Sequence, residues 1–187
     1  MDLFDPLKIR DVVLKNRIVV SPMCQYSSSD GFATDWHLVH LGSRAVGGAA
    51  LVFTEASAVT PEGRISPWDL GIWKDEHIEQ LSRIARFIKE QKVIPGMQLA
   101  HAGRKGSTKR PWEGVGLIPP SEGGWTPVAS SPFPFDATYP IPTALDEAGG
   151  EKAAGLRKHS YAEHSLGEYT NRSPVWLQQG GPVSLPA

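Results

Sequence analysis

Side chains that could do chemistry stand at the ends of two apolar runs in this sequence. Cys24 and Tyr26 follow the run at residues 16–20, which stops at Ser21-Pro22 because proline cannot donate a hydrogen bond to a sheet ladder. Gln98 ends a second run, where a buried amide must satisfy both a donor and an acceptor. A thiol, a phenol and an amide at strand ends predict a small-molecule site on strand-end loops.

Nucleophilic and metal-based chemistry is less well supported. Cys24 is the single cysteine, which excludes an internal disulfide and a cysteine-based zinc cluster. A hydrolase using Cys24 or Ser21 with a histidine is a weaker hypothesis, because no motif places an oriented base beside either residue. His37 and His40 lie three residues apart without an acidic residue or a third histidine at ligand spacing. We interpret them as helix-surface and packing residues and predict no metal site.

Composition indicates an ordinary globular protein. Of the 187 residues, 40% are hydrophobic and 21% are charged, which is enough apolar material for one core. A formal net charge of −1 argues against nucleic acid and anionic membrane surfaces as partners. The N-terminus has no basic and apolar signal pattern, and no window is apolar enough for a membrane span. We therefore expect a cytoplasmic protein that spans no membrane.

The elements that must position these side chains alternate between strand and helix. We expect a hairpin over 7–14 around Arg10-Asp11, then strands at 16–20, 49–59 and 93–99. A first helix follows Thr34-Asp35 and stops at Gly47-Gly48, and a second opens at Asp75. Apolar residues recur at near-helical spacing in both helices, at Trp36, Val39, Leu41 and Ala45 in the first and at Ile78, Leu81, Ile84, Ala85 and Ile88 in the second.

This alternation predicts an α/β protein with parallel strands, although the pattern does not choose between a barrel and an open sheet. Residues 111–142 are rich in proline, glycine, serine and aromatics, which argues against any regular element there. So long an excursion after the third strand is typical of a functional loop on the active face.

Six short motifs in fixed order resemble the Old Yellow Enzyme family, in its subgroup with a cysteine in the first strand-end motif. The resemblance covers about residues 3–147 and rests on Leu3-Phe4-Asp5-Pro6-Leu7, Asn16-Arg17-Ile18, Ser21-Pro22-Met23-Cys24-Gln25-Tyr26, Thr54-Glu55-Ala56-Ser57-Ala58-Val59, Gly63-Arg64-Ile65 and Gln98-Leu99-Ala100-His101-Ala102-Gly103-Arg104-Lys105.

The resemblance implies a fold and an activity. The fold would be part of a TIM (β/α)8 barrel, with only its N-terminal strands and helices present. The activity would be that of an ene-reductase, in which FMN is reduced by NADPH or NADH and passes hydride to an activated alkene such as a small enone. A homo-oligomer is possible, and the sequence does not identify the substrate or the preferred nicotinamide.

The resemblance also implies roles for individual residues. Tyr26 and Cys24 would be the catalytic residues, with Tyr26 on the substrate carbonyl and Cys24 tuning the flavin without acting as a nucleophile. The expected cofactor-binding residues are Ser21, Pro22, Met23, Cys24, Ala56 and Gln98. From the residues alone, the alternatives are that Tyr26 is a surface aromatic and Ala56 a helix-packing alanine. Arg104 and Lys105 could face an anionic reduced flavin or be solvated loop cations.

The resemblance stops near Ala148. Residues 1–148 are expected to form the N-terminal part of an FMN-binding barrel, and 149–187 a divergent tail without strand pattern. The tail could reflect a frameshift, a truncation or natural divergence. We therefore expect an oxidoreductase that is truncated and impaired as written. The alternative is a non-catalytic fragment that acts as a binding or interaction protein.

Overall fold

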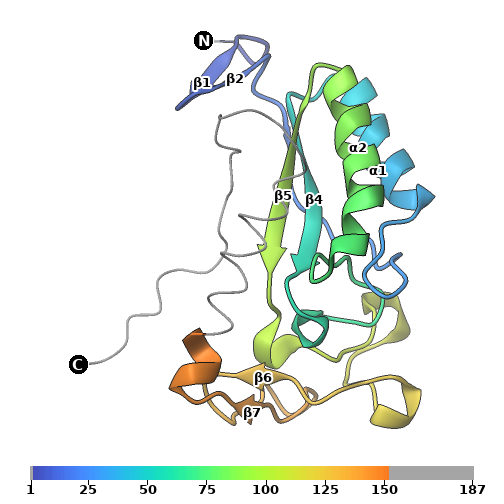
Figure 1. The fold of residues 1–187 in the computed structure, drawn as a ribbon, viewed down its shortest axis with the longest axis vertical. Coiled ribbons are helices and arrows are strands. Elements are labelled where there is room, and N and C mark those ends of the chain that lie inside the picture. Colours follow the sequence, from blue (N-terminus) through green and yellow to red (C-terminus); the bar gives the residue numbers. More distant parts are fainter. Residues whose placement is uncertain (1, 152–187) are drawn as a thin grey trace.

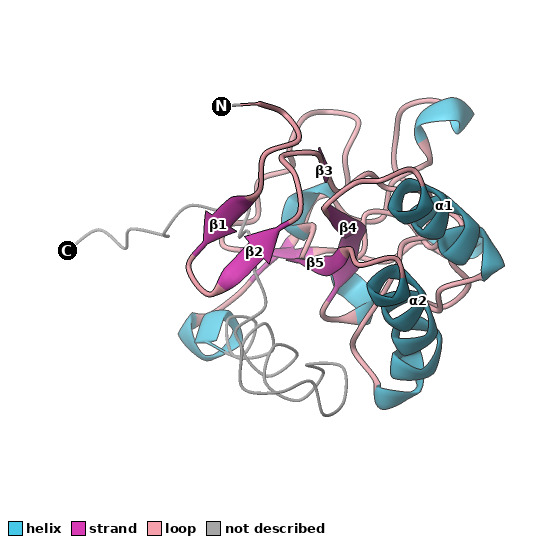
Figure 2. Ribbon diagram, turned by 90° about the horizontal axis from the view of Figure 1, so that it is seen from above, coloured by secondary structure: helices cyan, strands magenta, loops and turns pink. Residues whose placement is uncertain are grey.

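The protein is built around a small parallel sheet with helices packed on one face. The structure, a computed structural model, describes residues 2–151. The central sheet has the order β3-β4-β5, formed by Val19–Val20, Leu51–Ala58 and Ile94–Ala100, and both pairings are parallel. Helices α1 (Asp35–Val46) and α2 (Ile78–Glu90) lie side by side against this sheet (Figures 1 and 2). The predicted alternation of strands and helices is therefore confirmed.

A hairpin covers the end of the sheet where the strands begin. β1 (Leu7–Ile9) pairs antiparallel with β2 (Val12–Leu14), and Arg10-Asp11 forms the predicted turn. Leu14 is fully buried against Leu51 and Phe53 of β4, so the hairpin contributes to a second, smaller core. In Figure 1 the hairpin lies at the top, and β4 and β5 run downward to the opposite end. That lower end is free to carry functional loops.

The two helices differ in how well the sequence predicts their buried face. In α2 the predicted stripe is correct, with Leu81, Ile84, Ala85 and Ile88 buried after a 3-10 turn at Asp75–His77. In α1 the predicted apolar stripe is partly wrong, because Trp36 and Val39 are exposed. The buried face of α1 is instead made by His37, Leu41, Gly42 and Ala45. A buried histidine on this face requires a polar partner inside the protein.

A bulge in β4 sets which side chains share a face near the end of the sheet. Phe53 pairs with Gly96, but the next aligned pair is Ala56 with Gln98, so β4 holds one more residue than β5. Met97 and Leu99 pack in the core beneath the helices, so Gln98 between them points to the opposite face. Ala56 shares that opposite face because the bulge changes the alternation of β4.

The excursion at 111–142 contains regular structure that the sequence did not predict. Short 3-10 helices occupy Pro111–Glu113 and Pro120–Glu122, and β6 (Val128–Ala129) pairs in parallel with β7 (Thr143–Ala144). The expectation of no regular element was therefore wrong. Its proline and glycine content limits these elements to two or three residues, below the length that periodicity can detect. Both strands lie at the lower end of the sheet (Figure 1).

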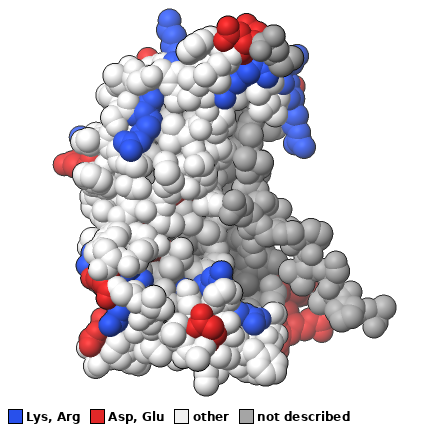
Figure 3. Space-filling model, turned by 180° about the vertical axis from the view of Figure 1, so that it is seen from behind, with Lys and Arg blue, Asp and Glu red and all other residues white. Residues whose placement is uncertain are grey.

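Charged side chains are distributed without a single-sign patch on the face in Figure 3. Blue and red side chains of both signs gather toward the two ends of the molecule, and the middle of that face is mostly uncharged. None of the helices among residues 2–151 is long and apolar enough to cross a membrane.

The loop between β4 and α2 is held by a buried carboxylate. Asp69 is 1% exposed and accepts hydrogen bonds from the Ile65 and Ser66 backbone N–H groups and from the Ser66 hydroxyl, at 2.8, 3.2 and 2.7 Å. Burial raises the pKa of Asp69 to about 6, against the lowering effect of these hydrogen bonds. The loop therefore carries an acid that titrates near neutral pH.

Asp69 should make stability depend on pH in a defined window. Because its pKa rises from 3.8 to about 6 on folding, its contribution to stability is fully present below pH 3.8 and is lost as the pH rises through about 6. Asp69→Asn removes the titration. We expect the free energy of unfolding of the wild type, relative to this variant, to decrease between these pH values in urea denaturation. Equal pH slopes for the two proteins would contradict this assignment.

Candidate functional site

Three loops meet at the end of the sheet where the parallel strands finish. They follow β3, β4 and β5, and backbone hydrogen bonds join them across the sheet. The loop after β4, here called the brace loop, is bonded to both of the others. Its Trp68 carbonyl accepts a hydrogen bond from the Ser28 N–H at 2.9 Å, and its Gly63 carbonyl accepts one from the Ala102 N–H at 2.7 Å. The structure therefore brings the first and third loops to one rim, as expected for strand-end loops of a parallel sheet.

Ala56 and Gln98 form the floor of this rim. They are aligned partners on adjacent strands and share the face opposite the helices. Ala56 is therefore not a helix-packing alanine. The Gln98 side chain is half-buried, and no residue within 2–151 forms a hydrogen bond with its amide. A half-buried amide with free donor and acceptor groups next to a small residue suits a flat ligand with a polar edge.

Cys24 lies beside this floor as a protonated thiol. Burial first, and then the charges of Asp69 and Glu55, raise its pKa to about 12, although a hydrogen bond from the Ala56 backbone N–H opposes the rise. At neutral pH the thiolate is almost absent. Since the thiolate is the nucleophile, this environment disfavours covalent catalysis by Cys24.

Tyr26 lies next to Cys24 in an unusual backbone conformation. Its φ of 51° is in the left-handed region, which costs a non-glycine residue roughly 1–2 kcal/mol. Burial and then the nearby Cys24, Asp69 and Glu55 raise the phenol pKa to about 12. The ring is half-buried and meets Trp112 edge-on, with 5.5 Å between centroids. The phenol is therefore an uncharged donor that faces the long excursion.

The remaining predicted residues occupy the approach to Cys24. Ser21 and Met23 are exposed and Pro22 is half-buried, so this segment presents a surface. The Met23 carbonyl accepts a hydrogen bond from the Gln25 side chain at 2.8 Å. Arg104 and Lys105 are engaged elsewhere, since Arg104 donates to the Ser131 hydroxyl and the Lys105 ammonium lies over the Phe135 ring.

A buried polar pair that the sequence analysis missed lies behind the loop. His37 Nε2 and Glu55 Oε1 are 3.0 Å apart, and their side chains are 2% and 1% exposed. Reading His37 as a surface or packing residue overlooked this partner. The detectable signal was Glu55 itself, because a glutamate inside an apolar strand is rarely buried without a partner. No group of three metal-ligating side chains is found within residues 2–151.

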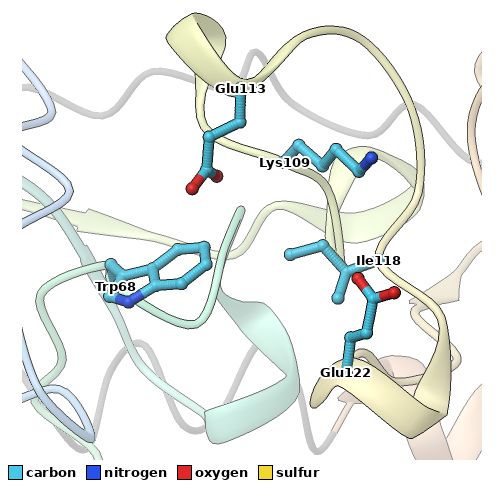
Figure 4. A pocket seen from close by; sticks show the side chains of 5 residues that line it. All are labelled: Trp68, Lys109, Glu113, Ile118 and Glu122. Carbon is cyan, nitrogen blue, oxygen red and sulfur yellow. The ribbon is translucent and has the colours of Figure 1, made fainter.

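A cavity of about 250 Å³ opens beside the rim, between the loops after β4 and β5 (Figure 4). Its lining residues are Trp68, Lys109, Glu113, Ile118 and Glu122. The Arg110 guanidinium stacks over Trp68 at 3.8 Å and pairs with Glu113, so the excursion is fastened to the brace loop. Sequence reasoning did not identify this cavity.

Sequence comparison relates the chain to flavin-dependent oxidoreductases. The model of the NADH:flavin oxidoreductase / NADH oxidase family matches residues 2–124. An NADPH dehydrogenase of Bacillus cytotoxicus is 48% identical over 147 residues, covering 78% of this chain and 38% of that protein. An NADPH dehydrogenase of Bacillus subtilis is 56% identical over 105 residues, covering 55% of this chain and 31% of that protein. The chain thus spans well under half the length of these relatives.

Solved structures show the same fold. An Old Yellow Enzyme homologue from Zymomonas mobilis superimposes with a TM-score of 0.71 at 25% identity, over 89% of this chain and 45% of that one. Morphinone reductase in complex with tetrahydroNAD gives 0.70 at 21% identity, over 88% and 47%. The elements described above are therefore N-terminal strands and helices of a TIM barrel, and the chain belongs to the NADH:flavin oxidoreductase / NADH oxidase family that includes the Old Yellow Enzymes.

Proposed function

We propose that this chain forms the ring-facing part of an FMN-dependent ene-reductase that takes hydride from NADPH or NADH and delivers it to an activated alkene. One observation carries the proposal. The bulge in β4 aligns Ala56 with Gln98 on the face opposite the helices, and the Ala56 backbone N–H is near enough to the Cys24 thiol to lower its pKa. A small residue, an amide without a hydrogen-bond partner among residues 2–151 and a neutral thiol thus share one rim.

These residues fit a flavin ring. The Gln98 amide has no partner within residues 2–151, and a flavin pyrimidine edge offers it both a donor and an acceptor. Ala56 leaves room for a flat ring where a longer side chain would not. When bound, FMN supplies the hydride chemistry, and the protein supplies orientation and electrostatics.

The other side chains have distinct roles in this proposal. Tyr26, uncharged with a pKa of about 12, donates a hydrogen bond to the carbonyl of a small enone-type substrate. Cys24 remains a thiol and adjusts the electronic environment of the ring. Ser21, Pro22 and Met23 form the surface along which the ring lies.

We further propose a division of the site along the barrel. Residues 1–148 provide the ring-facing groups, whereas the FMN phosphate is held by the loops after the seventh and eighth strands, as is frequent in TIM barrels. On this basis the 187-residue chain alone should retain FMN weakly and turn over slowly. Cytoplasmic location and homo-oligomer formation remain part of the proposal. Residues 152–187 of the predicted tail lie outside the described residues.

The test uses the chain itself and a completed barrel. The completed barrel is a chimera that joins residues 1–124 to the remaining part of the Bacillus cytotoxicus NADPH dehydrogenase. FMN retention is measured by flavin absorbance, and reduction of a cyclic enone by NADPH is followed without oxygen. Retained FMN that NADPH reduces and the enone reoxidises supports the proposal. A folded chimera that remains colourless contradicts it.

Gln98→Leu should weaken FMN binding in the chimera. The change leaves the polar edge of the ring unpaired, at a cost of roughly 1–3 kcal/mol, which corresponds to about a fivefold to 150-fold higher Kd. Gln80→Leu, on α2 beneath the sheet, is the matched control and should leave the Kd unchanged. An unchanged Kd in Gln98→Leu would remove this residue from the flavin site.

Cys24→Ala should change the flavin without abolishing the reaction. The thiol is protonated, with a pKa of about 12, and tunes the ring instead of forming a covalent intermediate. In the chimera we expect a shifted flavin reduction potential and altered half-reaction rates, measured by anaerobic titration and stopped flow. Complete loss of turnover with normal flavin content would show that the thiol takes part chemically.

A further inference from the structure

The loop that carries Cys24 and Tyr26 is attached to a buried pair that the proposed chemistry does not use. Glu55 occupies the bulge of β4, between Phe53 and Ala56. Its Oε2 accepts a hydrogen bond from the Gln25 backbone N–H at 3.1 Å, and its Oε1 lies 3.0 Å from His37 Nε2. The Glu55 side chain therefore points away from the face that carries Ala56 and Gln98, and it binds the loop after β3 from the helix side.

The hydrogen bonds determine the tautomer of His37 and the acceptor role of Glu55. The Thr34 backbone N–H donates to His37 Nδ1 at 2.9 Å, so Nδ1 is an acceptor and carries no proton. The proton of a neutral ring is then on Nε2, which donates to Glu55. Glu55 thus accepts one N–H on each oxygen. A carboxylate satisfies both donors, whereas a carboxamide has a single acceptor oxygen and satisfies only one.

Glu55 and His37 contact the chain on both sides of Tyr26, the residue with a strained backbone. Tyr26 has a φ of 51°, and such a conformation persists only where its surroundings determine it. On one side Glu55 holds Gln25, and on the other the Ser28 hydroxyl lies 3.3 Å from His37 Nε2. The Ser27 carbonyl is tied further to the Thr34 hydroxyl at 3.3 Å. Both flanks of Tyr26 are therefore anchored to the same pair.

We infer that Glu55 and His37 are positioning residues, which hold the loop at 24–28 so that the Cys24 thiol and the Tyr26 phenol face the rim. The inference rests on the proposed function only for the identity of the ligand at that rim. The anchoring itself is a property of this chain and can be measured without flavin.

Cys24 gives a direct readout, because it is the single cysteine of the chain. The 187-residue protein is alkylated with iodoacetamide over a range of pH, and the adduct is followed by mass spectrometry. The charged groups that face the thiol are Asp69 and Glu55, with Tyr26 nearby. Glu55→Gln removes one charge and one anchor. We expect its pH profile to move to lower pH and its rate near pH 8 to rise about threefold or more, equivalent to roughly half a pKa unit.

Glu55→Asp distinguishes the effect of the position of the Glu55 carboxylate from the effect of its charge. The shorter side chain keeps the carboxylate but cannot hold Gln25 and His37 together, so positioning predicts faster alkylation of Cys24 in this variant as well. If only Glu55→Gln reacts faster, Glu55 acts through its charge and the inference fails. Ser28→Ala removes only the hydroxyl contact to His37 and should give a smaller increase. This milder variant also serves if Glu55→Asp does not fold.

Two controls exclude other causes of faster alkylation. Asp35→Asn removes an exposed carboxylate from the same helix, where Asp35 pairs with Arg83, and should leave the rate unchanged. Ile88→Ala lowers the stability of the fold through a cavity far from the loop, because Ile88 is buried in α2. If Ile88→Ala accelerates alkylation as much as Glu55→Asp, global unfolding explains the effect and the inference is overturned. If the chain shows the Glu55 effects but the folded chimera binds no FMN, the proposed function alone is refuted.

Discussion

The register of β4 on β5 is the constraint on which the proposed site depends. If the same residues paired without the bulge between Phe53 and Ala56, regular alternation would turn Ala56 toward the helices and leave Gln98 with a different neighbour. The bulge changes this alternation once and leaves the apolar packing below it intact. Val52 stays in the helix-side core, and Phe53 stays in the smaller core under the hairpin. The one-residue bulge therefore separates the part of β4 that packs in the two cores from the part that lines the proposed site.

The same bulge explains why the first loop can hold a strained tyrosine. Glu55 is directed toward α1 at the point where His37 reaches the buried face of that helix. The N-cap residue of α1 is Thr34, whose backbone N–H orients the His37 ring. Strand irregularity, helix start and loop conformation are thus coupled through a few hydrogen bonds. A change in any one of them alters the place of Cys24 and Tyr26.

The sequence predicted the elements whose side chains are apolar and periodic. The α2 stripe, the hairpin and the parallel strands follow from patterning that burial alone dictates. The exposure of Trp36 and the burial of His37 do not follow from this patterning. At that helix the contact between His37 and Glu55 overrides the hydrophobic pattern. The bulge was also beyond prediction, since its register depends on pairing between segments distant in sequence. The family motifs located Ala56 and Gln98, but only the register shows that they are neighbours.

Charge balance sets the last condition on any flavin at this rim. Two buried carboxylates, Asp69 and Glu55, lie near the thiol and disfavour a further negative charge. Arg104 and Lys105 do not offset them at this point, because their head groups contact Ser131 and Phe135. With a pKa of about 6, Asp69 is the group best placed to respond. A further negative charge at this rim would raise the pKa of Asp69 again and favour its protonated form.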